Sequence, residues 1–288
     1  MQRCRGITRR TIHYFFQHDS TLKQIYTYSP SKLSQLFKIP MKNASLFHKD
    51  LHNPELRRKL FQDLKNYTIM TIVDENYPDV LKRIKDPPLV LYLNGDESLL
   101  SDSPKLSIIG TRQPSNEAMQ KTKLFVQPLI KHNWVIVSGM AKGIDSYAHH
   151  LTLKYGGKTI AVLGSGFNYI YPKQNISLYE EIMKKGLIIT EYPPDQPPIK
   201  YHFPERNRII SGLSFGTLVI EATERSGTLI TVDQALDQGR EVYAVPGSPL
   251  IPQTKGCHQM IQDGAKLVID VKDILEDWEG IGLHLFNS

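Results

Sequence analysis

Short apolar segments alternate with longer amphipathic segments from about residue 67 onward, and this alternation limits the fold more than any other feature of the sequence. Parallel strands that are covered on both faces are apolar along their whole length, whereas the helices that connect them are amphipathic. The alternation therefore predicts an α/β fold built from βαβ units around a parallel or mixed sheet. The expected strands are Ile69–Val73, Leu89–Leu93, Leu106–Ile109, Val135–Val137, Thr159–Leu163, Leu187–Thr190, Thr217–Ile220, Glu241–Val245 and Ala265–Ile269. The expected helices include Glu117–Lys131, Ile144–Tyr155, Leu178–Lys185 and Leu229–Gln238.

Residues 1–66 have a different pattern, with apolar residues at helical spacing in Thr11–Phe16, Ser31–Phe37 and Pro54–Asn66. In the last of these segments, leucines recur at every fourth position and Pro54 suits a first helical turn. The chain is therefore expected to have two domains, a small all-helical domain over residues 1–66 and an α/β domain over residues 67–288.

Charge is distributed unevenly between these two parts of the chain. Residues 1–68 contain 13 Lys and Arg against 4 Asp and Glu, a net charge of +9, whereas the other 220 residues contain 22 against 25, a net charge of −3. A basic N-terminal domain would attract a polyanion such as DNA or RNA. A helical domain with a solvated basic face would have the same composition, so charge alone leaves both interpretations open.

Several classes of protein are excluded by composition. Cys4 and Cys257 are the only cysteines, too few for a disulfide framework or a four-cysteine zinc site. No apolar run approaches the roughly 20 residues of a membrane-spanning helix, and the basic N-terminus is not followed by the apolar segment of a secretory signal. We therefore expect a cytoplasmic protein without membrane insertion.

Glycine-containing turns follow three consecutive strands of the expected sheet. Glycine lets the backbone approach a phosphate closely, and a helix N-terminus presents N–H groups to an anion. The alternative is that these glycines only relieve steric crowding at strand-to-helix turns. Neither the P-loop pattern nor a complete dinucleotide-binding fingerprint is present, so we expect no bound cofactor. The turns are Gly110-Thr111-Arg112, Ser138-Gly139-Met140-Ala141-Lys142-Gly143 and Gly164-Ser165-Gly166.

The segment Phe203–Leu213 has an unusual arrangement of cations. Pro204 suits a helix start, which places Arg206, Asn207 and Arg208 in the first turns. Positive charge there opposes the helix dipole unless an anion compensates for it. We expect one arginine to form an internal ion pair, with Glu191 or Glu221 as the candidate partner, and the other to face a ligand.

Two other groups of residues resemble sites. Asp145 and His149 lie four positions apart, but no further ligand accompanies them, so a surface or helix-capping role is favoured over a metal site. Glu221 followed by Ser226-Gly227-Thr228 is compatible with a catalytic carboxylate or with a simple helix cap. Because no nucleophile–base pair is visible, we expect no enzymatic activity.

Beyond residue 70, the motifs occur in an ordered series. They are Tyr77-Pro78, Ile84-Lys85-Asp86-Pro87-Pro88, Ile109-Gly110-Thr111-Arg112, Ser138-Gly139-Met140-Ala141-Lys142-Gly143-Ile144-Asp145, Leu163-Gly164-Ser165-Gly166, Tyr171-Pro172, Thr190-Glu191-Tyr192-Pro193-Pro194, Phe203–Ser214, Val219-Ile220-Glu221-Ala222, Ser226-Gly227 and Ala244–Ser248. This series resembles the DNA-processing protein family called DprA or Smf.

The resemblance implies an extended Rossmann-like domain preceded by a small helical, SAM-like domain. It also implies single-stranded DNA binding, loading of the RecA recombinase during natural transformation, and a homodimer, with single-strand-binding protein as a further candidate partner. By this resemblance, Gly110-Thr111-Arg112 and Lys200 would contact phosphates, Phe203 would stack on a base, and Arg206 to Arg208 would form the pocket floor. The complete set of expected DNA-binding residues is Gly110, Thr111, Arg112, Ser138, Gly139, Lys142, Gly164, Lys173, Lys200, Phe203, Arg206, Asn207 and Arg208.

The sequence departs from the family pattern at both ends. Only Arg5-Gly6-Ile7 remains of an N-terminal hairpin signal, and the short segment after Trp278 leaves no room for a C-terminal winged-helix domain. Two alternatives to a recombination mediator stay open. One is a nucleotide N-glycosidase of the lysine-decarboxylase-like type, with Glu221 as its carboxylate; the other is a nucleotide-binding sensor that uses the same glycine turns.

Overall fold

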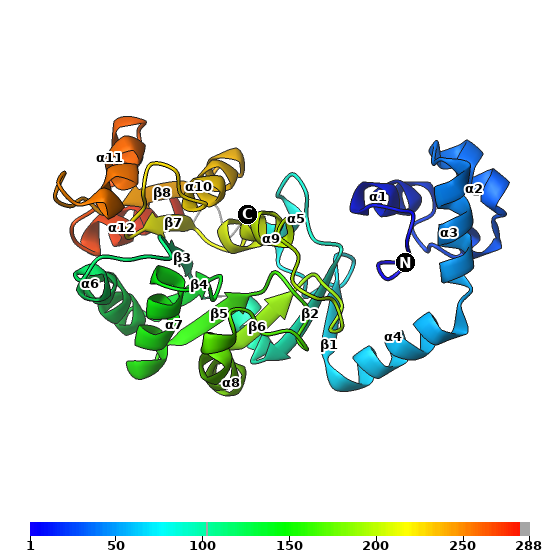
Figure 1. The fold of residues 1–288 in the computed structure, drawn as a ribbon, viewed down its shortest axis with the longest axis horizontal. Coiled ribbons are helices and arrows are strands. Elements are labelled where there is room, and N and C mark those ends of the chain that lie inside the picture. Colours follow the sequence, from blue (N-terminus) through cyan, green and yellow to red (C-terminus); the bar gives the residue numbers. More distant parts are fainter. Residues whose placement is uncertain (102, 283–288) are drawn as a thin grey trace. The chain divides into compact units, whose positions relative to one another are not determined.

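The computed structural model describes residues 1–101 and 103–282. The chain divides into two compact units, Met1–Ile69 and a larger unit that begins at Met70 (Figure 1). The N-terminal unit contains α1 (Arg9–His18), a 3-10 turn at Gln24–Thr27, α2 (Pro30–Phe37), α3 (Met41–Leu51) and α4 (Pro54–Asn66).

Helices α1, α2 and α3 of the N-terminal unit enclose a small apolar core. Phe15, Leu33 and Phe47 are fully buried in it, and the ring centroids of Phe15 and Phe47 lie 5.2 Å apart. Helix α4 differs from its amphipathic pattern, because Leu60 and Leu64 on its apolar side are 41% and 53% exposed.

The larger unit is organised around a nine-stranded sheet with the order β1-β2-β6-β5-β4-β3-β7-β8-β9. All of the pairings from β6 across to β9 are parallel, whereas β2 pairs antiparallel with β6, so the sheet is mixed. The strands are β1 (Thr68–Thr71), β2 (Val90–Gly95), β3 (Lys105–Ile109), β4 (Val135–Ser138), β5 (Lys158–Val162), β6 (Leu187–Thr190), β7 (Gly216–Val219), β8 (Glu241–Ala244) and β9 (Lys266–Leu267). Each overlaps an expected strand, and the predicted α/β, Rossmann-like fold class is confirmed.

Helices cover both faces of this sheet (Figure 1). One face packs against apolar residues of α9, α10 and α11, and the other against apolar residues of α6 and α7. The helices are α5 (Asp79–Lys82), α6 (Ala118–Lys131), α7 (Ile144–Lys154), α8 (Ile176–Lys185), α9 (His202–Gly212), α10 (Thr228–Asp237), α11 (Lys255–Gln262) and α12 (Lys272–Asp277). Because the strands between these layers are buried on both sides, their side chains are apolar at nearly every position.

The strand order reverses direction at β3. From β3 the chain proceeds through β4, β5 and β6 on one side, and it then returns to pair β7 with the opposite edge of β3. The loops that leave the carboxyl ends of β3 and β7 consequently diverge to opposite faces of the sheet. In open α/β sheets, such a switch point is where a ligand crevice forms.

Candidate functional site

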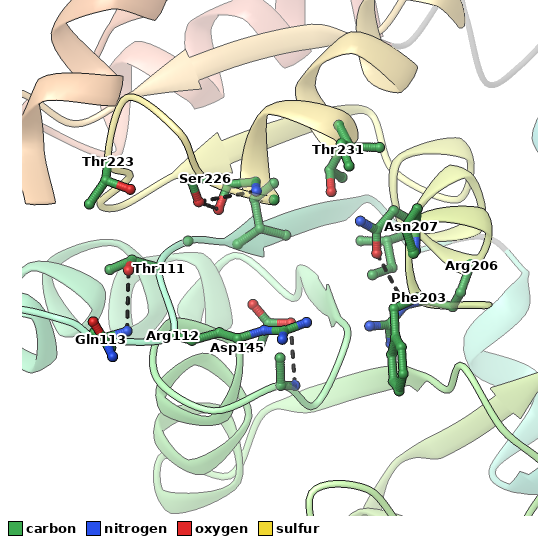
Figure 2. A pocket seen from close by; sticks show the side chains of 18 residues that line it. Thr111, Arg112, Gln113, Asp145, Phe203, Arg206, Asn207, Thr223, Ser226 and Thr231 are labelled. Carbon is green, nitrogen blue, oxygen red and sulfur yellow. Dashed lines mark hydrogen bonds between the residues drawn. The ribbon is translucent and has the colours of Figure 1, made fainter. Parts of the chain in front are cut away.

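A pocket lies at this switch point, beyond the carboxyl ends of β3 and β7 (Figure 2). Its volume of about 390 Å³ falls within the range of small-molecule sites. Its lining combines the loop after β3, the first turns of α9, and the loop that leads from β7 into α10. The lining residues are Ile109, Gly110, Thr111, Arg112, Gln113, Ala141, Asp145, Phe203, Pro204, Arg206, Asn207, Ile210, Thr223, Ser226, Gly227, Thr228, Ile230 and Thr231.

The loop after β3 forms one wall of the pocket. The backbone N–H of Thr111 donates to the carbonyl of Glu221 at 2.8 Å, which ties this loop to the chain leaving β7. A Cβ at Gly110 would lie 2.6 Å from the side chain of Ile144 and 2.7 Å from the Glu221 carbonyl, so only glycine fits there. Arg112 lies two positions after Gly110, and its exposed side chain extends along the pocket (Figure 2).

Arg206 forms part of the pocket floor and is only 3% exposed. Its Nη1 donates to the carbonyl of Gly139 at 2.7 Å and to the carbonyl of Val162. Desolvation lowers the pKa of Arg206 to about 10, although the nearby Asp145 carboxylate acts in the opposite direction. The guanidinium is therefore held by protein groups at the sheet edge.

Asp145 lies beneath the same floor and is 7% exposed. Its carboxylate accepts hydrogen bonds from the backbone N–H groups of Gly139 at 3.1 Å and Ala141 at 3.4 Å. Desolvation raises the pKa of this carboxyl, while Arg206 and the two N–H groups lower it. The sequence predicted a surface or helix-capping role for Asp145. Asp145 does order the turn before α7, as a cap would, but it is buried rather than on the surface.

Phe203 supplies an aromatic surface at the pocket. Its half-buried ring lies over Gly164, where an added Cβ would come within 2.9 Å of the ring. The ring also contacts Tyr171, with centroids 5.4 Å apart and planes inclined by 50°. Since Phe203 lines the pocket, its position is compatible with stacking against a planar ligand.

Four of the residues predicted to bind DNA are hydrogen-bonded, ion-paired or covered by other groups of the protein. Ser138 is fully buried and donates to the carbonyl of Ile108 at 2.7 Å. Gly139 is covered by the Arg206 guanidinium, which an added Cβ would approach to 2.6 Å, and Gly164 is covered by Phe203. The structure therefore shows a packing role for each of these three residues.

Arg208 is the fourth residue of this kind. It is 6% exposed and lies outside the pocket lining. Its Nη2 lies 2.7 Å from Oε2 of Glu191, and its Nε lies 3.5 Å from Oδ2 of Asp86. The expected internal ion pair therefore forms with Glu191, and the charge of Arg208 is compensated within the protein.

Three predicted lysines lie outside the pocket lining on exposed surface. Lys142 lies in the turn before α7, Lys173 in the short 3-10 turn before α8, and Lys200 in the loop before α9. Six of the predicted residues are brought together in the pocket: Gly110, Thr111, Arg112, Phe203, Arg206 and Asn207.

Glu221 is a structural residue in this fold. It is fully buried, and its carboxylate accepts hydrogen bonds from the backbone and hydroxyl of Ser115, at 2.8 and 2.6 Å, and from Nζ of Lys121 at 2.9 Å. It does not line the pocket. His149, the other candidate that sequence patterns suggested, is fully buried rather than on the surface, and its Nδ1 lies 2.7 Å from Oγ1 of Thr159.

The sequence pattern did not identify the wall formed by the β7–α10 loop as a ligand surface. Thr223, Ser226, Gly227, Thr228 and Thr231 line the pocket from this side. The available signal was the Ser-Gly-Thr turn that opens a helix directly after a strand, which is equally typical of a plain helix cap.

Residues 1–101 and 103–282 contain neither a metal-binding cluster nor a membrane-spanning helix. No three or more His, Cys, Asp or Glu side chains converge in a way that could hold a metal ion. None of the helices in this part of the chain is long and apolar enough to cross a membrane.

Residues 68–279 match the family described as DNA recombination-mediator protein A. The chain is 46% identical over 206 residues to DNA processing protein DprA of Bacillus subtilis, covering 72% of this chain and 69% of that protein. It is 44% identical over 220 residues to the Streptococcus pneumoniae DprA, covering 76% and 77% of the two chains.

Two solved structures have the same fold. The X-ray structure of Streptococcus pneumoniae DprA matches with a TM-score of 0.85 and 36% identity over 94% of each chain. A structure of the Helicobacter pylori protein, determined for its single-stranded DNA binding mode, matches with a TM-score of 0.67 and 31% identity over 74% of this chain and 96% of that one. The chain belongs to the DNA recombination-mediator protein A family, whose curated members carry the names DprA and Smf.

Proposed function

We propose that this protein binds single-stranded DNA in the pocket at the β3–β7 switch point and acts as a recombination mediator. The observation that carries the proposal is the combination, in one pocket, of a glycine turn ending in the exposed Arg112 and the aromatic ring of Phe203. Sequence-tolerant single-strand binders use this pairing of cationic groups for phosphates with aromatic faces for bases. The Helicobacter pylori relative, which binds single-stranded DNA, supports this choice of ligand.

Each group has a distinct role in this proposal. Arg112 presents a planar fork of donors that pairs with a phosphate, and the turn before it lets the sugar–phosphate backbone approach closely. Phe203 stacks on a base without discriminating among bases, because every base has a π-face. Arg206 and Asp145 fix the floor on which the strand rests.

The exposed lysines extend this interface beyond the pocket. We propose that Lys142, Lys173 and Lys200 lie along the path of the strand and contribute through charge, which is the dominant source of affinity for a polyanion. From family membership we further propose that the protein loads the RecA recombinase onto the bound strand during natural transformation, as a cytoplasmic homodimer.

We also propose that the protein performs no chemistry on its ligand. A nucleotide hydrolase would use Glu221, but this carboxylate is buried and accepts hydrogen bonds from Ser115 and Lys121. Incubation with nucleoside monophosphates is therefore expected to release no free base. Release that is abolished by Glu221→Gln would favour the hydrolase alternative.

Fluorescence anisotropy with labelled oligothymidylates and with a duplex of the same length tests DNA binding. The single strand should bind more tightly than the duplex. The logarithm of the affinity should fall linearly with the logarithm of the salt concentration, because each phosphate contact releases counterions. Equal affinity for the two forms would contradict the proposal. RecA filament formation on strands coated with single-strand-binding protein, with and without this protein, tests the loading step separately.

A further inference from the structure

The wall formed by the β7–α10 loop faces the Arg112 turn across the pocket (Figure 2). Its polar lining residues are the hydroxyl side chains of Thr223, Ser226, Thr228 and Thr231, with Gly227 between them. The charged neighbours Glu224 and Arg225 are exposed and do not line the pocket. This wall is therefore neutral, in contrast to the cationic wall opposite it.

Thr231 is the most informative residue of this wall. Thr231 is only 3% exposed, and its side chain points into the pocket (Figure 2). Its hydroxyl forms no hydrogen bond with any group of residues 1–101 and 103–282. Other buried helical threonines behave differently, since Thr122 and Thr152 each donate to the carbonyl four residues earlier at 2.7 Å. The Thr231 hydroxyl therefore opens onto the pocket and is available to donate to an acceptor that arrives with a ligand.

Gly227 supports the same interpretation from the backbone. Its φ of −60° and ψ of −12° are ordinary helical values that any residue adopts. An added Cβ would meet no atom within 4 Å, whereas at Gly110 and Gly139 it would collide with neighbouring groups. The space in front of Gly227 is thus clear of the described residues, so a ligand can approach the backbone closely there.

Ser226 and Thr228 complete the set of donors. The Ser226 hydroxyl donates to Oγ1 of Thr228 at 2.8 Å and accepts from the Thr228 backbone N–H at 3.2 Å. Oγ1 of Thr228 thus accepts from Ser226 and retains its own O–H to donate. These hydroxyls surround the first turn of α10, a ten-residue helix whose positive dipole end favours an anion.

We propose that Gly227, Thr228 and Thr231 form a second, uncharged phosphate-binding wall. This inference rests on the proposed binding of single-stranded DNA and adds to it: one nucleotide of the strand occupies the pocket with a phosphate on each wall. Arg112 holds one phosphate through charge. The α10 wall holds the other through hydroxyl groups and the helix N-terminus. The phosphate is either an internal phosphodiester of the strand or a terminal phosphomonoester.

Two substitutions test this wall without disturbing the fold. Gly227→Ala places a methyl group where the phosphate would lie, and Thr231→Val removes the hydroxyl while keeping the shape of the side chain. Gly227→Ala should leave the melting temperature unchanged or raise it slightly, because alanine has less freedom in the unfolded chain and fits the native φ and ψ. Thr231→Val should not lower it either, because the hydroxyl it removes has no partner to lose.

Binding is measured by anisotropy with oligothymidylates of about 20 nucleotides, one with and one without a 5′-phosphate. Each variant should bind about tenfold more weakly, as expected for loss of a hydrogen bond to a charged group. The slope of log affinity against log salt should stay that of the wild type, because no cation is removed. Gly280→Ala, also at an open glycine, and Thr122→Val, which removes a buried hydroxyl outside the pocket, serve as matched controls.

The outcomes are distinct. Weakening on both oligonucleotides assigns the wall to an internal phosphodiester, and weakening only on the 5′-phosphorylated one assigns it to a terminal phosphate. Wild-type affinity of both variants for both oligonucleotides would overturn the second wall while leaving DNA binding intact. Failure of the wild-type protein to bind either oligonucleotide would instead refute the proposed function, and the second wall with it.

Discussion

Two arginines line the same pocket in contrasting environments. Arg206, on α9, is 3% exposed and donates to the carbonyls of Gly139 and Val162. Arg112, in the loop after β3, is exposed, and within the described part of the chain it has no hydrogen-bond or ion-pair partner. Cations at this sheet edge therefore divide into those that complete the fold and those that remain available to a ligand.

Arg208 extends this comparison to the whole start of α9. Its charge is compensated by Glu191 and Asp86, just as Arg206 is held by carbonyls and by the field of Asp145. The dipole of α9 opposes both cations, and the buried anions and carbonyls offset that cost. The arginine-rich helix start is therefore primarily a device for joining α9 to the sheet edge.

The largest expected effect is on stability, and it separates the two arginines. Arg206→Ala removes the cation that faces the buried Asp145 and should lower the free energy of unfolding by about 3–5 kcal/mol. Arg112→Ala changes an exposed side chain and should stay within about 0.5 kcal/mol of the wild type. Urea unfolding monitored by circular dichroism measures both. Equal unfolding midpoints for the two variants would remove the distinction between them.

The next effect concerns binding by the aromatic surface. Phe203→Ala should weaken binding of oligothymidylate by about 1–3 kcal/mol, the range for base–aromatic stacking, with an unchanged dependence on salt. Because Phe203 also covers Gly164, truncation could act through the fold, and Phe203→Leu separates the two causes. Leucine should restore the melting temperature but not the affinity. Recovery of both with leucine would show that Phe203 only fills space.

A smaller effect, on the pH dependence of stability, tests the contrast between the buried His149 and the exposed His150. Burial lowers the pKa of His149 to about 3, whereas His150 is exposed. Between pH 6.5 and 3 the unfolded chain binds a proton at His149 that the folded chain excludes, so stability falls as pH falls, by at most about 1.4 kcal/mol per pH unit. His149→Asn should flatten this dependence between pH 6.5 and 5, and His150→Asn should not. If stability depended on pH in the same way in the wild type and in His149→Asn, the lowered pKa of His149 would be contradicted.

The regular elements were predictable from sequence because their patterns reflect burial directly. The apolar runs that predicted β3 to β8 are strands covered on both faces, and the glycine after β3 marked the pocket edge correctly. The antiparallel pairing of β2 with β6 carries no such pattern. Helix α3 was also missed, since Pro40 precedes it as a breaker and only Ala44, Phe47 and Asp50 of it are buried.

The functions of individual residues at the sheet edge were predictable only in part. Composition identifies glycines and arginines but not the groups that cover them, as the packing of Gly139, Gly164 and Arg208 shows. Each depends on a side chain or carbonyl from a distant segment of the chain. The α10 wall was missed because a hydroxyl turn at a helix start has the same sequence pattern as a helix cap. Only the structure shows that the Thr231 hydroxyl has no partner in the described part of the chain.

The most direct measurement is the salt dependence of oligothymidylate binding by the wild type, Arg112→Ala and Lys200→Ala, with Lys154→Ala at the opposite end of α7 as the control. If Arg112 contacts a phosphate, its loss should lower affinity and reduce the slope of log affinity against log salt by about one unit or less. Lys200→Ala should do the same to a similar or smaller extent, and Lys154→Ala should leave the slope unchanged. A wild-type slope and affinity in Arg112→Ala, with normal folding, would contradict single-stranded DNA binding at this pocket.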